Sequence, residues 1–149
     1  MNIVLYQPQI PHNTGAIGRI CLATGSKLHL IHPLGFFIDE KSLKRAGMDY
    51  WSQIEIYEYE NWECFLNKNM FFCETESKKI YTDIEYKKDD YFIFGSEGAG
   101  LPKYIIEKYS KNIIGIPMKK EARSLNLSIS VAIILYKAFE KINFEGMGL

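Results

Sequence analysis

Two stretches near the end of the chain decide the fold: FGSEGAGLP (residues 94–102) and IPMKKEARSLNLSISVAIILYKAF (residues 116–139). In the first, an apolar strand over residues 91–94 runs directly into three glycines. In the second, an apolar strand over residues 113–116 runs into a loop that opens a long apolar helix. Ligands of open α/β sheets collect at the carboxyl ends of strands. We therefore expect a ligand site where these two strands end.

The rest of the chain alternates between expected strands and expected helices. The strands are expected over residues 2–6, 27–32, 54–57, 70–74, 91–94 and 113–116. The helices are expected over residues 13–23, 39–46 and 60–67, after Pro102, and over residues 124–142. Asn13 or Thr14 is the expected cap of the first helix, and Gly25 its expected end. This alternation favours an α/β fold with a largely parallel sheet flanked by helices.

The composition indicates one globular domain over residues 1–149, of which 47% are apolar. No apolar run approaches the roughly eighteen residues of a membrane span. The amino-terminal MNIVLYQPQ has no basic region, so no signal peptide is expected. The three cysteines are odd in number and lack metal-ligand spacing. Reduced thiols, a cytoplasmic location and no metal site are therefore expected.

The charge balance bears on a nucleic-acid partner. The net charge is zero, so only a local basic patch could attract RNA. Lysine outnumbers arginine fifteen to three, and the arginines are Arg19, Arg45 and Arg123. Because the guanidinium group is a planar fork that suits phosphate, these three positions are candidates for RNA contact.

The last helix has two apolar stripes at helical spacing. One stripe consists of Val131, Ile134, Leu135, Ala138 and Ile142. The other consists of Ile129, Ala132, Ile133, Tyr136 and Phe139. A helix that is apolar on two faces must be covered on both. We expect a homodimer through this helix; the alternative is a helix buried within one subunit.

The glycine loop matches neither common phosphate-binding pattern. Its glycines lack the G-x-G-x-x-G spacing, and no Gly-Lys-Ser/Thr follows them. A tight turn between strand and helix is the simple alternative. In the second loop, Ser124 and Asn126 either cap the last helix or line a slot between Ile116 and Leu125. Such a slot suits an adenine ring that is recognised by main-chain groups.

Three motifs carry a family resemblance. FGSEGAGLP and IPM…RSLNLSISVAI resemble the second and third motifs of the SPOUT superfamily of RNA methyltransferases, in its ribose 2′-O-methylating SpoU branch. NTGAIGR (residues 13–19) resembles the first motif. NIVLYQPQIPHNTGAIGRICLATGSKLHLIHPLGF and LKRAGMDYW are similar to the YibK/TrmL-like tRNA wobble-nucleotide methyltransferases. The resemblance covers essentially the whole chain.

The resemblance implies a C-terminal trefoil knot, S-adenosyl-L-methionine held in that knot, and a dimer with its active site at the interface. It leaves no room before the first motif for a separate RNA-binding domain. The implied cofactor contacts are Glu74, Gly95, Ile116, Ser124 and Leu125. Glu74 departs from the apolar residue usual in the family, so that a carboxylate could lie near the positive sulfonium.

The resemblance also implies a catalytic set of Arg19, Asn13 and Glu97. An arginine stays protonated in proteins, so we expect Arg19 to bind a phosphate and orient the ribose hydroxyl. Glu97 either accepts the proton, holds Arg19, or serves as a helix-start carboxylate. RNA contacts are expected from Lys41, Lys44, Arg45 and Arg123. Tyr50 and Trp51 either stack on RNA bases or pack in the core.

The expected function is methylation of the ribose 2′-hydroxyl of cytidine or uridine 34, in the tRNA anticodon stem-loop. The second product would be S-adenosyl-L-homocysteine. One alternative is a SpoU-type enzyme that acts on another tRNA site or on ribosomal RNA. The other is a non-catalytic RNA-binding assembly factor.

Overall fold

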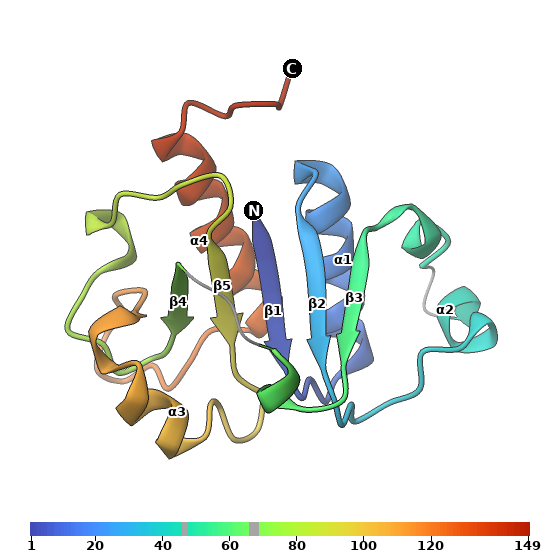
Figure 1. Cartoon of the computed structure of the whole chain (residues 1–149), viewed down its shortest axis with the longest axis horizontal. Helices are drawn as coiled ribbons and strands as arrows, with labels where there is room; N and C mark the ends of the chain where they lie inside the picture. The colour runs from blue at the N-terminus through green and yellow to red at the C-terminus, as the bar shows by residue number, and fades with distance from the viewer. Residues whose placement is uncertain (46–47, 66–68) are drawn as a thin grey trace.

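The computed structural model, which describes residues 1–45, 48–65 and 69–149, contains a six-stranded sheet with the order β3-β2-β1-β5-β4-β6. The strands are β1 (Asn2–Tyr6), β2 (Lys27–Ile31), β3 (Ile56–Tyr59), β4 (Met70–Cys73), β5 (Tyr91–Phe94) and β6 (Ile113–Ile114). Every pair of neighbouring strands is parallel. The predicted α/β fold with a parallel sheet is confirmed (Figure 1).

Helices cover both faces of the sheet. The α-helices are α1 (Pro11–Thr24), α2 (Glu40–Arg45), α3 (Lys103–Lys108) and α4 (Leu127–Lys141). Helices α1 and α4 pack side by side on one face, and α3 packs on the other (Figure 1). Short 3₁₀ turns lie at Trp51–Gln53, Trp62–Cys64, Tyr81–Asp83 and Ser110–Asn112. In the part of the chain that the structure describes, no helix is long and apolar enough to cross a membrane.

The central strand β1 shows why the sequences of the strands are continuous apolar runs. Ile3 and Leu5 lie in the core beneath α1 and α4, whereas Val4 lies in the core beneath α3. Successive side chains of a strand point to opposite faces, and here both faces are covered. For this reason the sequence NIVLY does not alternate between apolar and polar residues.

Two glycines of the segment 13–19 are explained by packing on α1. A Cβ atom on Gly15 would lie 2.6 Å from the sulfur of Met48, and one on Gly18 would lie 2.9 Å from the Trp51 ring. The absence of side chains lets the turn at Trp51–Gln53 lie directly against α1. Tyr50 and Trp51 pack against the core there, which favours the core alternative for both.

Helix α1 begins earlier than predicted and helix α4 begins later, and both differences have a physical cause. Helix α1 begins at Pro11, not after a cap at Asn13 or Thr14, because proline at the first helical position needs no hydrogen-bond partner for its nitrogen. It ends at Gly25 as predicted, with a left-handed φ of 64°. Helix α4 begins at Leu127 because the Asn126 side chain caps it, accepting from Ser128 N at 2.9 Å.

Three shorter predictions were wrong in extent. The helix expected over residues 60–67 is a single 3₁₀ turn at Trp62–Cys64, and residues 66 and 67 lie outside the described part. Strand β3 begins at Ile56, two residues later than expected. Strand β6 ends at Ile114, since Gly115 forms an isolated bridge with Ile80 instead. The helix expected over residues 39–46 is α2, and residue 46 also lies outside the described part.

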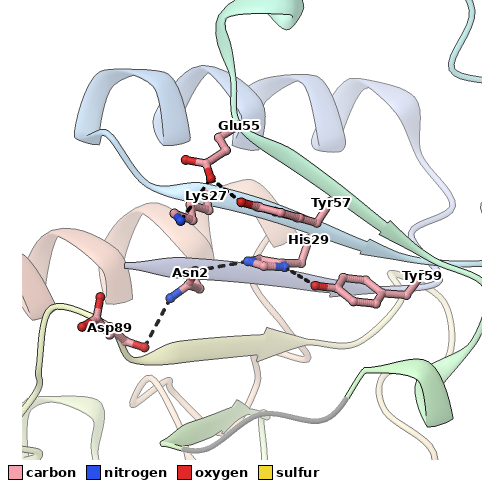
Figure 2. Close-up of polar contacts among 7 residues, drawn as sticks. All are labelled: Asn2, Lys27, His29, Glu55, Tyr57, Tyr59 and Asp89. Carbon is pink, nitrogen blue, oxygen red and sulfur yellow. Dashed lines mark hydrogen bonds and ion pairs between the residues drawn. The ribbon is translucent and has the colours of Figure 1, made fainter.

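A buried polar network joins β2 to β1 and β3 (Figure 2). His29 is 3% exposed; its Nε2 lies 3.2 Å from Asn2 Oδ1, and its Nδ1 lies 2.9 Å from the Tyr59 hydroxyl. Asn2 Nδ2 donates to the carbonyl of Asp89, so Asn2 Oδ1 is an acceptor and His29 Nε2 is the donor. A neutral imidazole thus has both nitrogens paired. Burial, followed by the charge of Lys27, lowers the pKa of His29 to about 4.

This network predicts acid sensitivity. His29 takes up its proton more readily when the chain is unfolded, since its folded pKa is depressed from 6.5. Stability is therefore complete above about pH 6.5 and falls as the pH drops towards 4. Between pH 7.5 and 5.0 the loss from this one group is about 2 kcal/mol.

Urea unfolding at the two pH values measures this loss. His29→Gln should show a smaller fall in the free energy of unfolding than the wild type. The matched control is His32→Gln, because His32 is exposed and bonds Glu58 at the surface. An unchanged pH dependence in His29→Gln would contradict the assignment.

Candidate active site

A cavity of about 520 Å³ opens at the carboxyl ends of β4, β5 and β6. Its walls are the loops that follow these three strands, together with the starts of α1 and α4. The strands are neighbours in the order β5-β4-β6, so their trailing loops meet at one edge of the sheet. All five residues expected to contact the cofactor line this cavity: Glu74, Gly95, Ile116, Ser124 and Leu125.

The glycine loop is closed on itself. Ser96 and Gly100 exchange two backbone hydrogen bonds, of 3.3 and 2.8 Å, and Gly100 has a left-handed φ of 68°. A Cβ atom on Gly95 would lie 2.2 Å from the carbonyl carbon of Gly100, so no side chain fits there. The glycine loop is therefore both a tight turn and a wall of the cavity.

Glu97 fastens the glycine loop to the start of α1. Its carboxylate accepts from the backbone N–H of Gln9 at 2.8 Å, from that of Ile10 at 3.1 Å, and from Asn13 Nδ2 at 3.2 Å. Helix α1 has no side-chain cap of its own and no acidic residue in its first turn. A carboxylate beside a helix N-terminus is stabilised by the helix dipole. Glu97 therefore supplies the negative charge that the first turn of α1 lacks.

The helix-start alternative for Glu97 is thus the one that the structure favours. Within the described residues of one chain, Glu97 forms no ion pair with an arginine, so its contact with Arg19 stays a prediction. Its role as a proton acceptor stays a prediction.

Asn13 carries the connection on to α4. While its Nδ2 donates to Glu97, its Oδ1 accepts from Asn126 Nδ2 at 3.0 Å. Asn126 Oδ1 in turn caps α4. The residues that line the cavity from three distant parts of the sequence are therefore joined by one chain of hydrogen bonds.

Glu74 turns its side chain towards the glycine loop. Its Oε1 accepts from the backbone N–H of Leu101 at 3.1 Å, and a Cβ atom on Gly100 would lie 3.6 Å from the same oxygen. Burial raises the pKa of Glu74 above its ordinary value, although the N–H groups of Leu101 and Thr75 oppose this shift. The Glu74 carboxylate thus lies against Gly100, another residue that lines the cavity.

Arg19 lies outside the cavity of its own chain. Its guanidinium carbon lies 4.9 Å from the centre of the Tyr50 ring, and the Tyr50 hydroxyl donates to Gly15 O at 2.6 Å. Arg19 follows Asn13 by six positions, which is about 240° around a helix, so the two side chains leave α1 in different directions. The structure separates Arg19 from the other two expected catalytic residues.

The expected RNA-binding residues fall into two groups. Arg123 is exposed and lines the cavity. Lys41, Lys44 and Arg45 belong to α2, which lies beyond β3 at the opposite end of the sheet from β4 (Figure 1). A ligand that touches both groups must therefore span the sheet.

The cavity has the chemistry that an adenosyl cofactor needs. Ile116, Leu125 and Leu127 provide apolar surface for a base, and the loops provide main-chain polar groups. Glu74 provides a negative charge for a cationic ligand. No cluster of three or more His, Cys, Asp or Glu side chains with metal-binding geometry occurs in the described ranges.

Comparison with known proteins defines the class. Residues 1–136 match the SpoU rRNA Methylase family. A tRNA (cytidine(34)-2′-O)-methyltransferase from Methylovorus glucosotrophus is 42% identical over 150 residues, which cover 97% of both chains. The chain therefore belongs to the SpoU methylase family, which confirms the resemblance. The C-terminal trefoil knot that the resemblance implies stays a prediction.

Two solved structures are similar over almost the whole chain. One, from a study of the 2-OH methylation of C/U34 on tRNA, is 33% identical, has a TM-score of 0.84 and covers 95% of each chain. An AdoMet-bound rRNA methyltransferase from Sinorhizobium meliloti is 26% identical with a TM-score of 0.76, over 93% of this chain and 55% of that one.

The hydrogen-bond chain predicts separable effects at Asn126. Asn126→Ala removes the cap of α4 and the bond to Asn13, and should lower the free energy of unfolding by about 1–2 kcal/mol. Asn126→Asp keeps the acceptor for the helix but cannot donate to Asn13, so most of this stability should return. Urea unfolding of both variants measures the difference; equal losses would show that the cap does not stabilise α4.

Proposed function

We propose that this protein transfers a methyl group from S-adenosyl-L-methionine to the ribose 2′-hydroxyl of nucleotide 34, cytidine or uridine, in the anticodon loop of tRNA. The observation that carries the proposal is that all five expected cofactor residues line one cavity, together with Asn13 and Glu97. Membership of the SpoU methylase family supports the reaction type.

The wobble nucleotide is favoured over other RNA sites by the extent of the similarity. The Methylovorus glucosotrophus relative is named for cytidine 34 of tRNA and matches over 97% of its own length. The rRNA methyltransferase from Sinorhizobium meliloti matches over only 55% of its length. A non-catalytic assembly factor is disfavoured because Gly95, Ser124 and Asn13 are all in the cavity.

The cofactor would be held by the three loops of the cavity. Ile116 and Leu125 would contact its adenine, and Gly95 and Ser124 would offer polar groups without filling the space. When bound, the cofactor supplies an electrophilic methyl group on a positively charged sulfur. The protein contributes position, because holding two reacting groups in line is worth on the order of 7–11 kcal/mol.

Arg19 is proposed to act in the cavity of a partner subunit. It is exposed on α1, and α1 packs beside α4, whose outer surface carries exposed apolar side chains. A dimer through these helices would bring Arg19 of one protomer towards the cavity of the other. There its planar fork would bind the phosphate beside nucleotide 34 and orient the 2′-hydroxyl. The phosphate or a water molecule would take the proton.

The dimer itself rests on the outer stripe of α4. Ile129 is 51% exposed and Tyr136 is 43% exposed, as an uncovered stripe requires. Phe139, which was assigned to the same stripe, is buried within its own subunit, so the outer surface is smaller than the sequence predicts.

The basic residues of α2 would extend the RNA-binding surface by contacting phosphates along the stem.

The dimer predicts the effect of a charge on α4. Tyr136→Asp should convert the protein to a monomer in sedimentation analysis at micromolar concentration, because a carboxylate cannot be buried unpaired in an apolar interface. Tyr104→Asp is the matched control, since Tyr104 is also about half exposed but lies on α3, across the sheet. A wild-type protein that sediments as a monomer would overturn the dimer.

The role of Arg19 predicts a loss of turnover without a loss of cofactor binding. Arg19→Ala should reduce transfer of tritiated methyl to bulk tRNA by about 10²–10³-fold, as for other lost transition-state contacts. The dissociation constant for S-adenosyl-L-methionine should stay within about twofold of the wild-type value. Arg19→Lys should recover only part of the rate, because lysine lacks the planar fork. Retained turnover in Arg19→Ala would contradict the assigned role.

Mapping the methylated nucleotide in the wild-type product tests the substrate. We expect a single 2′-O-methyl group at position 34. Methylation elsewhere in tRNA would favour another SpoU substrate, and no methylation of any RNA would favour the assembly factor.

A further inference from the structure

The charged residues of the cavity differ in the number of hydrogen bonds and ion pairs that they form. Three charged side chains line it: Glu74, Glu97 and Arg123. The Glu97 carboxylate is occupied by three N–H donors. Glu74 accepts from the main-chain N–H of Leu101. Within residues 1–45, 48–65 and 69–149, no lysine, arginine or histidine lies at ion-pair distance from Glu74.

A half-buried carboxylate without a cation is unfavourable by itself. Removal from water disfavours the charged form of Glu74, which is why its pKa is raised. The hydrogen bond to Leu101 does not by itself require a charge, since the amide oxygen of a glutamine could also accept from that N–H, although more weakly. A positively charged ligand in the cavity would restore the lost interaction.

We propose that the Glu74 carboxylate provides the counter-charge for the sulfonium of the bound cofactor, and so makes the protein distinguish S-adenosyl-L-methionine from S-adenosyl-L-homocysteine. This inference rests on the proposed function. It assigns to Glu74 a binding role in discrimination between substrate and product, beyond that of a wall residue.

The discrimination follows from the change of charge in the reaction. The methyl carbon forms a bond to the ribose oxygen, and its bond to sulfur breaks with both electrons remaining on sulfur. The 2′-hydroxyl proton would pass to the neighbouring phosphate or to a water molecule, and the sulfonium would become a neutral thioether. Glu74 then attracts the substrate but not the product, so the spent cofactor is released more readily.

Other placements of the carboxylate predict a different pattern. If Glu74 met the adenine amino group or the ammonium group of the amino-acid tail, it would bind both cofactor forms alike. Its removal would then weaken both to the same extent. The ratio of the two affinities therefore reports on the sulfonium alone.

Isothermal titration calorimetry at pH 7.5 tests the proposal with three ligands. They are S-adenosyl-L-methionine, S-adenosyl-L-homocysteine, and sinefungin, which carries an amine in place of the sulfonium. Glu74→Gln should weaken the two cationic ligands about five- to twentyfold and change the affinity for the neutral product by less than about twofold. Glu74→Leu should show the same selectivity, and thermal melting checks that both variants fold.

Glu76→Gln is the matched control, since Glu76 is exposed two residues further on and does not line this cavity. Its affinities for all three ligands should match those of the wild type. Equal weakening of the cationic and neutral ligands by Glu74→Gln, or no weakening of any, would overturn the inference. A wild-type protein that binds neither cofactor form would instead overturn the proposed function, so the two failures are distinguishable.

Discussion

The hydrogen bonds of one carboxylate hold the site together. Glu97 lies in the loop after β5, yet it accepts from the backbone of Gln9 and Ile10, more than eighty residues earlier. Each such bond to a charged group contributes about 1.5–3 kcal/mol. Through Asn13 the connection continues to Asn126 and the start of α4. The glycine loop, α1 and α4 are therefore positioned by the same few atoms.

The polar and charged residues that line the cavity are of two kinds: some position the loops, and others carry charges without an ion-pair partner among the described residues. Glu97, Asn13 and Asn126 form hydrogen bonds with one another, and Glu97 and Asn126 also bond to the backbone at the starts of α1 and α4, so these residues position the loops. Glu74 and Arg123 line the same cavity with charges that the described parts of the chain do not neutralise. These three residues fix the shape of the cavity, whereas the charges of Glu74 and Arg123 are available to a ligand.

Sequence reasoning succeeded where the governing interactions are local. The strand at Asn2–Tyr6 and the helix end at Gly25 were predicted because an apolar run and a left-handed glycine act within a few residues. It failed at the start of α1, because the group that caps this helix comes from Glu97. The separation of Arg19 from Asn13 could have been read from the helical repeat, since six positions do not return to the same side of a helix.

The sequence alone determined the parallel α/β class, because apolar periodicity is a local pattern, and the resemblance of three motifs to the SpoU methylases predicted the five residues that line the cavity. Tertiary structure alone decided how these residues meet. It placed Glu97 at the start of α1, buried Phe139, directed the Glu74 carboxylate to the glycine loop and kept Arg19 out of the cavity of its own chain. The physical reason is that hydrogen bonds and burial depend on distances between segments far apart in the chain, which a linear pattern does not contain.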